Sequence, residues 1–266
     1  MFLIDSHCHL DKLNYKKNNS NPKKILKIAY LKKVKMILLV STSLKNFKKI
    51  KKKFKKKFNN ILYSCGIHPL NIKNIKDFYK IKKFCSKKMV SAIGETGLDY
   101  YYGQKSNILQ KKIFRKHIRL GIKLNKPIIV HSRSAEKDTI KILQQENSEI
   151  CGGILHSFNQ NLNMLRNLLN LNFYISISGI ITFKNSENLR KIIKFIPLNK
   201  LLIETDSPYL TPEPYRGKEN NPSHINDIIT FISKIIKIKK KKLSKIIKKN
   251  FFNLFKLKKI KKTYFI

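Results

Sequence analysis

The chain has 266 residues, 42% of them hydrophobic, which is enough for a substantial buried core and argues against a disordered protein. Lysine and arginine number 58 against 15 acidic residues, for a net charge of +43, a balance that favours nucleic acid or an anionic membrane as partner. However, only six of these cations are arginine, and lysines solvated on helix exteriors are the favoured explanation of the charge.

The sequence also predicts the cellular compartment of the protein and the redox state of its cysteines. No stretch approaches the roughly 18 uninterrupted apolar residues of a membrane span, and Asp5 follows the start too closely for a signal peptide. We therefore expect a cytoplasmic protein with no membrane partner. Cys8, Cys65, Cys85 and Cys151 are far apart and form no CxxC pair, which predicts reduced, packed thiols.

Short runs of β-branched and aliphatic residues recur along the whole chain, and each is typical of a buried parallel strand. The runs cover residues 2–4, 36–40, 61–63, 90–93, 128–130, 153–155, 173–177 and 201–203. Helical spacing of apolar residues separates them, as over 108–122. This alternation predicts a (β/α)8 TIM-type barrel of class α/β. A doubly wound open sheet is the alternative, but no GxGxxG or GxxxxGK[ST] motif follows any run.

We expect a single domain over residues 1–266. The lysine-rich runs 48–57 and 237–249 keep apolar residues at helical intervals, so they are not linkers. Four prolines within 208–223 predict a long loop after the eighth strand. Helices within about 223–266 are expected to close the barrel and to end in a basic tail.

Histidines and acidic residues gather where the predicted strands end. In a parallel barrel all these ends share one rim, where barrel active sites are built. The residues concerned are His7, His9, His68, Glu95, His131, His156, Glu204 and Asp206. The barrel therefore brings together side chains that are distant in the sequence.

The spacing His7-Cys8-His9 points to metal binding. Residues i and i+2 of a strand project to one face, so both imidazoles can reach one cation while Cys8 points away. Together with Glu95, Asp206 and two further histidines, this set predicts two divalent cations from among Zn, Mn, Mg, Co and Ni. Because a cation pair activates water and polarises an ester or phosphoryl oxygen, the implied reaction is hydrolysis.

Seven segments and one late helix carry a family resemblance. They are 4–11 (IDSHCHLD), 66–69 (GIHP), 93–100 (IGETGLDY), 126–133 (KPIIVHSR), 155–158 (LHSF), 203–210 (IETDSPYL), 216–220 (RGKEN) and 250–255 (NFFNLF). Over essentially its full length the chain resembles the TatD family of metal-dependent hydrolases, a branch of the amidohydrolase-like barrels. It departs at Asn159 and Gln160, where the family has a small hydroxyl residue and glycine, which affects substrate fit more than metal binding.

The resemblance implies a ligand set and an activity. Six residues would share two ions: His7, His9 and Asp206 on one, His131 and His156 on the other, and Glu95 on both. Asp206 is also the natural group to take a proton from the attacking water. The implied enzyme is a deoxyribonuclease that trims DNA from the 3′ end, and we expect a monomer without an obligate protein partner.

Three residues near the predicted centre each have two interpretations. His68 points toward substrate or water, or it is a loop histidine bonded to backbone. Glu204 orients a metal ligand or pairs with a lysine. Arg133 grips a phosphate through its fork or pairs with Asp138.

Other residues near the rim have structural alternatives as well. Asp99 with tyrosines 100–102 forms either a wall on which a base stacks or ordinary loop packing. Gly94 and Gly97 are expected to permit tight backbone rather than to cradle phosphate. His117, among lysines and arginines of a predicted helix, is expected on the surface.

Two further functions remain open from the residues alone. The same ligand set suits an amidohydrolase or esterase that cleaves a small amide, an ester or an aminoacyl ester on RNA. A lysine-coated scaffold that binds nucleic acid by charge alone is the non-enzymatic alternative, but it predicts lost ligands, and all six are present.

Overall fold

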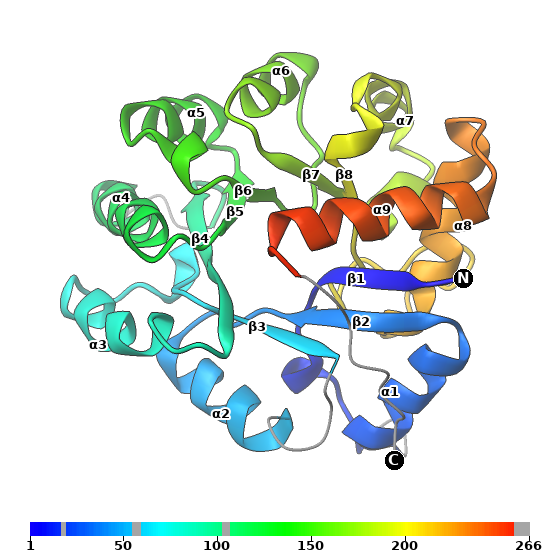
Figure 1. Cartoon of the computed structure of the whole chain (residues 1–266), viewed down its shortest axis with the longest axis horizontal. Helices are drawn as coiled ribbons and strands as arrows, with labels where there is room; N and C mark the ends of the chain where they lie inside the picture. The colour runs from blue at the N-terminus through cyan, green and yellow to red at the C-terminus, as the bar shows by residue number, and fades with distance from the viewer. Residues whose placement is uncertain (17–19, 55–59, 103–106, 258–266) are drawn as a thin grey trace.

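The computed structural model describes residues 1–16, 20–54, 60–102 and 107–257. Within them, eight parallel strands form one sheet in sequence order, and Figure 1 shows helices around the ring of strands, with the last helix crossing one end of it. The strands are β1 (Leu3–Cys8), β2 (Val34–Leu39), β3 (Ile61–Cys65), β4 (Val90–Asp99), β5 (Ile128–Arg133), β6 (Gly153–Leu155), β7 (Tyr174–Ile177) and β8 (Leu201–Ile203).

Hydrogen bonds between the two ends of the sheet close the ring. The Asp206 N–H donates to the His7 carbonyl at 3.0 Å, and the His9 N–H donates to the Ser207 carbonyl at 2.8 Å. On the β1 strand, Ser6 Oγ donates to the Ile203 carbonyl at 2.8 Å. The prediction of a (β/α)8 barrel is confirmed, and the closing bonds lie at the carboxyl ends of the strands.

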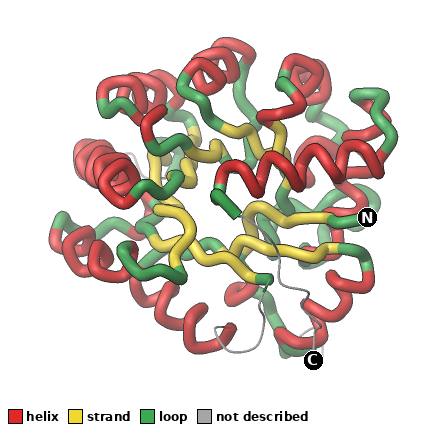
Figure 2. The backbone as a smooth tube through the Cα atoms, viewed as in Figure 1, coloured by secondary structure: helices red, strands yellow, loops and turns green. Residues whose placement is uncertain are grey.

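Amphipathic helices surround the barrel, and the last of them crosses its end (Figure 2). They are α1 (Pro22–Leu31), α2 (Leu44–Phe54), α3 (Lys76–Cys85), α4 (Asn107–Leu124), α5 (Glu136–Gln145), α6 (Leu162–Asn170), α7 (Glu187–Ile192), α8 (Ile225–Ile235) and α9 (Lys240–Leu254). In α2, Phe47, Ile50 and Phe54 are buried at helical spacing while lysines occupy the other face. The α8 and α9 helices contact β1 and β8. Residues 55–57 and the expected tail 258–266 lie outside the described residues.

The β1, β3, β4 and β5 strands extend further at their carboxyl ends than predicted, whereas the polar segment after β8 is not part of a strand. The β1, β4 and β5 strands continue through Cys8, Asp99 and Arg133 because their polar residues at the mouth remain in the ladder or close to it. By contrast, β8 ends at Ile203, so Glu204 and Asp206 follow the strand and do not lie on one of its faces. Asp206 instead adopts a left-handed backbone with φ of 54°.

The expectation that His117 is on the surface was wrong. Its side chain is fully buried in α4, where its neighbours Ile113, Phe114 and Ile118 form the apolar stripe. The imidazole Nδ1 donates to the Ile113 carbonyl at 2.9 Å, and Nε2 accepts from the Ile67 N–H at 3.2 Å. These two bonds satisfy both ring nitrogens, which explains how a histidine is accommodated there.

The loop after β8 and the free cysteines were both predicted from the sequence. Residues 204–221 contain no helix or strand and follow β8, and Asn220 Nδ2 ties this loop together by donating to the carbonyls of Thr205 and Tyr209. The four cysteines are free. Among the described helices, none combines the length and apolarity needed to cross a membrane.

Candidate metal centre

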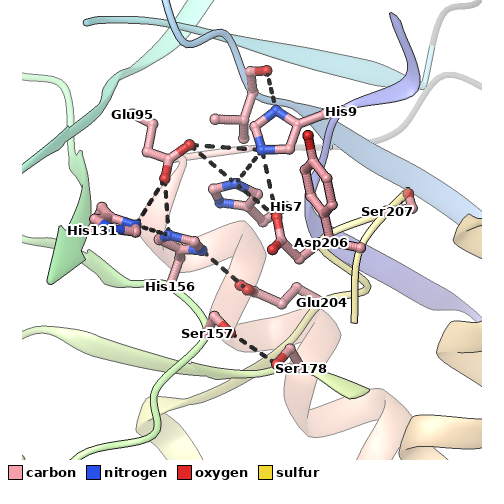
Figure 3. Close-up of polar contacts among 12 residues, drawn as sticks. His7, His9, Glu95, His131, His156, Ser157, Ser178, Glu204, Asp206 and Ser207 are labelled. Carbon is pink, nitrogen blue, oxygen red and sulfur yellow. Dashed lines mark hydrogen bonds and ion pairs between the residues drawn. The ribbon is translucent and has the colours of Figure 1, made fainter. Parts of the chain in front are cut away.

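Two histidines and an aspartate meet at the junction of β1 with the segment after β8 (Figure 3). The Nε2 atoms of His7 and His9 lie 3.2 Å apart. The Asp206 Oδ1 atom lies 3.6 Å from the first and 3.5 Å from the second. Cys8 is buried in the hydrophobic core, so only the two imidazoles reach this point, as the i, i+2 spacing predicted.

A second pair of histidines, His131 and His156, lies below Glu95 in the view of Figure 3. His131 Nδ1 and His156 Nε2 are 3.2 Å apart. One oxygen of Glu95, Oε1, lies 3.3 Å from the former and 3.0 Å from the latter. This pair comes from β5 and from the residue after β6.

The other oxygen of Glu95 faces the first pair. Its Oε2 lies 3.6 Å from His7 Nε2 and 3.7 Å from His9 Nε2. Within the described residues this buried oxygen has no hydrogen-bond partner. A single carboxylate thus presents one oxygen to each histidine pair.

Bonds behind the imidazoles set which ring nitrogen carries the proton. His9 Nδ1 lies 3.0 Å from the Val40 carbonyl, and a carbonyl only accepts, so Nδ1 is the protonated atom. The Nε2 lone pair of His9 therefore faces the cluster. His7 Nδ1 is buried and has no hydrogen-bond partner in the described part of the chain.

Carboxylates play the same role behind the second pair. His131 Nε2 donates to Asp99 Oδ2 at 3.0 Å, and His156 Nδ1 donates to Glu204 Oε1 at 3.3 Å. With the outer nitrogens donating, the lone pairs of His131 Nδ1 and His156 Nε2 are directed at each other. Two lone pairs 3.2 Å apart repel unless a proton or cation lies between them. The donor set therefore fits borderline divalent cations.

The potential at the centre favours positive charge. Burial alone would raise the pKa of Glu95, but the imidazoles of His68, His156 and His131 outweigh it and hold that pKa well below its usual value. Burial likewise opposes charging of His156, yet the carboxylates of Glu95 and Glu204 raise its pKa well above the ordinary value. The same field that would hold a proton there stabilises a metal ion.

Asp206 remains an anion at the mouth. Burial acts to raise its pKa, but the hydrogen bond with His9 and the nearby imidazoles of His7 and His156 lower it below the usual value. An ionised carboxylate at this position can accept hydrogen bonds from water.

Donor atoms within 4.8 Å of one another form three groups, which overlap. They are His7, His9 and Glu95; His7, His156 and Asp206; and His68, Glu95 and His131. The rings of His7 and His156 stack with centroids 4.1 Å apart, which explains why one group mixes the two pairs. Proximity alone therefore does not divide the donors between two ions.

Two supporting carboxylates were missed as such by sequence reasoning. Asp99 holds His131, although it was considered only with the tyrosines that follow it. Asp5 is fully buried and accepts from the Thr205 N–H at 2.9 Å and its hydroxyl at 2.5 Å, which ties β1 to the segment bearing Asp206. Burial raises the pKa of Asp5 to about 8. Asp5 lies two residues before His7 and Asp99 lies four residues after Glu95, so each shares a strand face with a predicted ligand. That spacing is the sequence signal from which they could have been found.

His68 bonds to backbone and also lies beside Glu95 and His131. Its Nδ1 accepts from the Leu70 N–H at 3.2 Å, as a loop histidine would. Its Nε2 lies 3.5 Å from Glu95 Oε1, and its ring contacts that of His131 at 4.5 Å. The ring therefore forms part of the wall of the centre.

Arg133 does not pair with Asp138, and that alternative was wrong. Asp138 binds Lys111 Nζ at 2.7 Å and the Tyr100 hydroxyl at 2.7 Å instead. The Arg133 guanidinium lies over the rings of Tyr101 and Tyr102, 4.3 and 4.7 Å from their centroids. Within the described residues, Glu204 bonds to His156 and not to a lysine, which was the other interpretation.

Close approach of strands β4 and β5 explains why residue 97 is glycine. A Cβ on Gly97 would lie 2.0 Å from the His131 carbonyl oxygen, and its φ of 134° is unfavourable for other residues. Glycine therefore allows β4 and β5 to approach where Glu95 and His131 meet. Beyond β6, Gln160 Nε2 donates to the Ser132 carbonyl at 3.1 Å, so the departure from the family pattern ties this turn to β5.

Comparison with known proteins agrees with this geometry. The family model described as TatD related DNase matches residues 4–256. The chain belongs to the TatD family. It is similar to a metal-dependent hydrolase of Buchnera aphidicola subsp. Acyrthosiphon pisum, with 56% identity over 241 residues that cover 88% of this chain and 91% of that protein.

Other relatives extend the likeness. The metal-dependent hydrolase YcfH of Escherichia coli is 43% identical over 233 residues, covering 88% of each chain. The crystal structure of YjjV, a TatD homologue of E. coli, superposes with a TM-score of 0.88 at 22% identity, covering 96% of this chain and 98% of that one, and supports the fold. The present TatD-family member is thus a metal-dependent hydrolase built on a (β/α)8 barrel.

Proposed function

We propose that this TatD-family hydrolase uses two divalent cations to hydrolyse phosphodiester bonds of DNA. One cation would be held by His7, His9 and Asp206 and the second by His131 and His156, and Glu95 would be a ligand of both. Such a cation pair supplies activated water and stabilises charge that develops on phosphoryl oxygens.

The observation that carries the proposal is the orientation of Glu95. Its Oε1 is 3.0 Å from His156 Nε2 while its Oε2 is 3.6 Å from His7 Nε2, so each oxygen is directed to a different histidine pair. A bridging anion lowers the repulsion between two neighbouring dications. A single-ion site would not need the second oxygen to be buried without a hydrogen bond of its own.

The residues of the chain divide the remaining work. Asp206, held ionised beside His7 and His9, accepts the proton of the attacking water. Asp99 and Glu204 accept hydrogen bonds from the outer nitrogens of His131 and His156 and so orient the inner nitrogens toward the cation site. His68, next to Glu95, is placed to donate a hydrogen bond to a substrate oxygen.

Family and charge support DNA as the substrate. The matching family is described as a DNase. The net charge of +43 favours a polyanion, and Lys12 Nζ, 5.4 Å from the Tyr209 ring centroid, places a cation near the His9 side of the mouth. Attraction of this kind supplies most of the sequence-independent affinity for nucleic acid.

The test is a nuclease assay with the full-length enzyme. We expect end-labelled single-stranded DNA to be shortened in the presence of Mn²⁺ or Mg²⁺, EDTA to stop the reaction, and Glu95→Gln to be inactive. A matched panel of aminoacyl and small amide or ester substrates is assayed in parallel. Inert DNA together with turnover of one of those substrates would contradict the DNA assignment and favour the amidohydrolase alternative.

A further inference from the structure

Two tyrosines are exposed in the turn that follows strand β4. Tyr101 and Tyr102 are 58% and 65% exposed, and their rings meet edge to face with centroids 4.6 Å apart. Large aromatic side chains with this exposure contribute little to the core. They stand in the turn at the carboxyl end of the strand that carries Glu95.

The guanidinium of Arg133 completes this surface. It lies over both rings, and Arg133 makes no ion pair within the described residues. Three other arginines have polar partners: Arg115 and Arg119 bind Glu146, and Arg190 donates to backbone carbonyls in the segment 181–184. Arg216 also lies over a ring, but over the single ring of Phe183, at 4.0 Å from its centroid. An exposed guanidinium stacked on aromatic rings keeps N–H groups available for an anion.

The surface is connected to the metal centre through Asp99. One oxygen of this carboxylate accepts from the Tyr102 N–H at 3.0 Å, and the other accepts from His131 Nε2 at 3.0 Å. Arg133 follows His131 by two residues on β5, a span of roughly 7 Å along a strand. The tyrosine turn and the arginine are thus held about one nucleotide's length from the candidate ligands.

We propose that Tyr101, Tyr102 and Arg133 form a nucleotide subsite that stacks one base of a single-stranded DNA substrate and binds its adjacent phosphate. This inference rests on the proposed function. The rings supply a sequence-tolerant platform for the base, and the arginine fork supplies paired donors for phosphate oxygens. A duplex, whose bases are stacked on one another, cannot use the platform without local opening.

The subsite is tested by equilibrium binding to the metal-loaded, full-length enzyme. The probe is a fluorescent oligothymidylate with nuclease-resistant phosphorothioate linkages, compared with an abasic strand of equal length. Loss of both rings in Tyr101→Ala/Tyr102→Ala is expected to weaken oligothymidylate binding at least about fivefold. Binding of the abasic strand is expected to change less than twofold.

Arg133→Lys keeps the charge but removes the planar fork. We expect it to weaken both strands by a few fold, because phosphate contact is common to both. The matched control is Tyr79→Ala, since Tyr79 is a similarly exposed tyrosine (57%) on the α3 helix, and its loss is expected to leave both affinities unchanged. Thermal denaturation verifies that each variant is folded.

The outcomes separate this proposal from the function on which it rests. If wild-type enzyme degrades DNA but the double tyrosine variant binds oligothymidylate normally, the subsite is wrong and the nuclease stands. Equal weakening for oligothymidylate and the abasic strand also contradicts base stacking. If wild-type enzyme neither binds nor degrades DNA, the proposed function itself fails.

Discussion

At the scale of single residues, Glu95 has the most demanding position in the molecule. It is a buried carboxylate, and the nearest polar atoms of five imidazoles lie within 3.0 to 3.7 Å of its two oxygens. An isolated charge in such a place costs several kcal/mol unless it is compensated. Protons can compensate it in the metal-free protein, and cations do so in the proposed centre.

Replacing Glu95 by Gln keeps the size of the side chain and removes its charge. We expect metal content to fall from about two ions to one or fewer per chain, because the repulsion between two dications is no longer reduced. Elemental analysis after dialysis against a trace-metal buffer measures this. Full loading of Glu95→Gln would mean that the residue does not bridge.

Glu204 provides a second prediction at this scale. Glu204→Gln still offers an oxygen to His156 Nδ1 but lacks the negative charge that makes the imidazole a stronger ligand. We expect metal affinity to fall about 10- to 100-fold, measured by competition with a chelator. An affinity equal to that of the wild type would assign Glu204 to stability alone.

At the scale of elements, β4 accounts for most of the site. Glu95, Gly97 and Asp99 follow one another at spacing two, so they share a face of this strand of ten residues. The glycine admits the neighbouring strand, the first acid faces both histidine pairs, and the second holds His131. The ligand geometry is therefore a consequence of strand alternation and close strand contact.

The same elements show what a single sequence can and cannot predict. Apolar runs and strand-end histidines predicted the barrel and the convergence of His7, His9, His131 and His156, since both depend on local periodicity. The position of the Arg133 guanidinium over the rings of Tyr101 and Tyr102 depends on a turn and could not be inferred from spacing. Burial of His117 was missed because its charged neighbours in sequence lie on the other face of α4.

The α4 helix yields a pH prediction. Burial lowers the pKa of His117 to about 4 from the ordinary 6.5, so the unfolded chain binds a proton first as pH falls. The free energy of unfolding should therefore decrease between about pH 6.5 and 4, by roughly 3 kcal/mol from this residue.

Urea denaturation with EDTA present measures this contribution as the difference between wild type and His117→Gln. The variant is expected to be less stable at pH 7 but to lose less stability on acidification. Parallel curves for the two proteins would show that His117 does not titrate in this window.

At the scale of the whole molecule, the question is whether the charge of +43 acts on DNA. Each phosphate contact to a single strand contributes roughly −0.7 to the slope of log affinity against log salt concentration. We expect a slope steeper than about −2, corresponding to three or more contacts. A nearly flat dependence would assign the lysines to composition rather than to substrate binding.

The most direct measurement is anomalous diffraction from crystals of the enzyme loaded with Mn²⁺ or Zn²⁺. The account predicts two peaks about 3.5 to 4 Å apart, one beside each oxygen of Glu95. One peak should contact His7, His9 and Asp206, and the other His131 and His156. A single peak at full metal saturation, or a second peak remote from Glu95, would contradict the bridged pair.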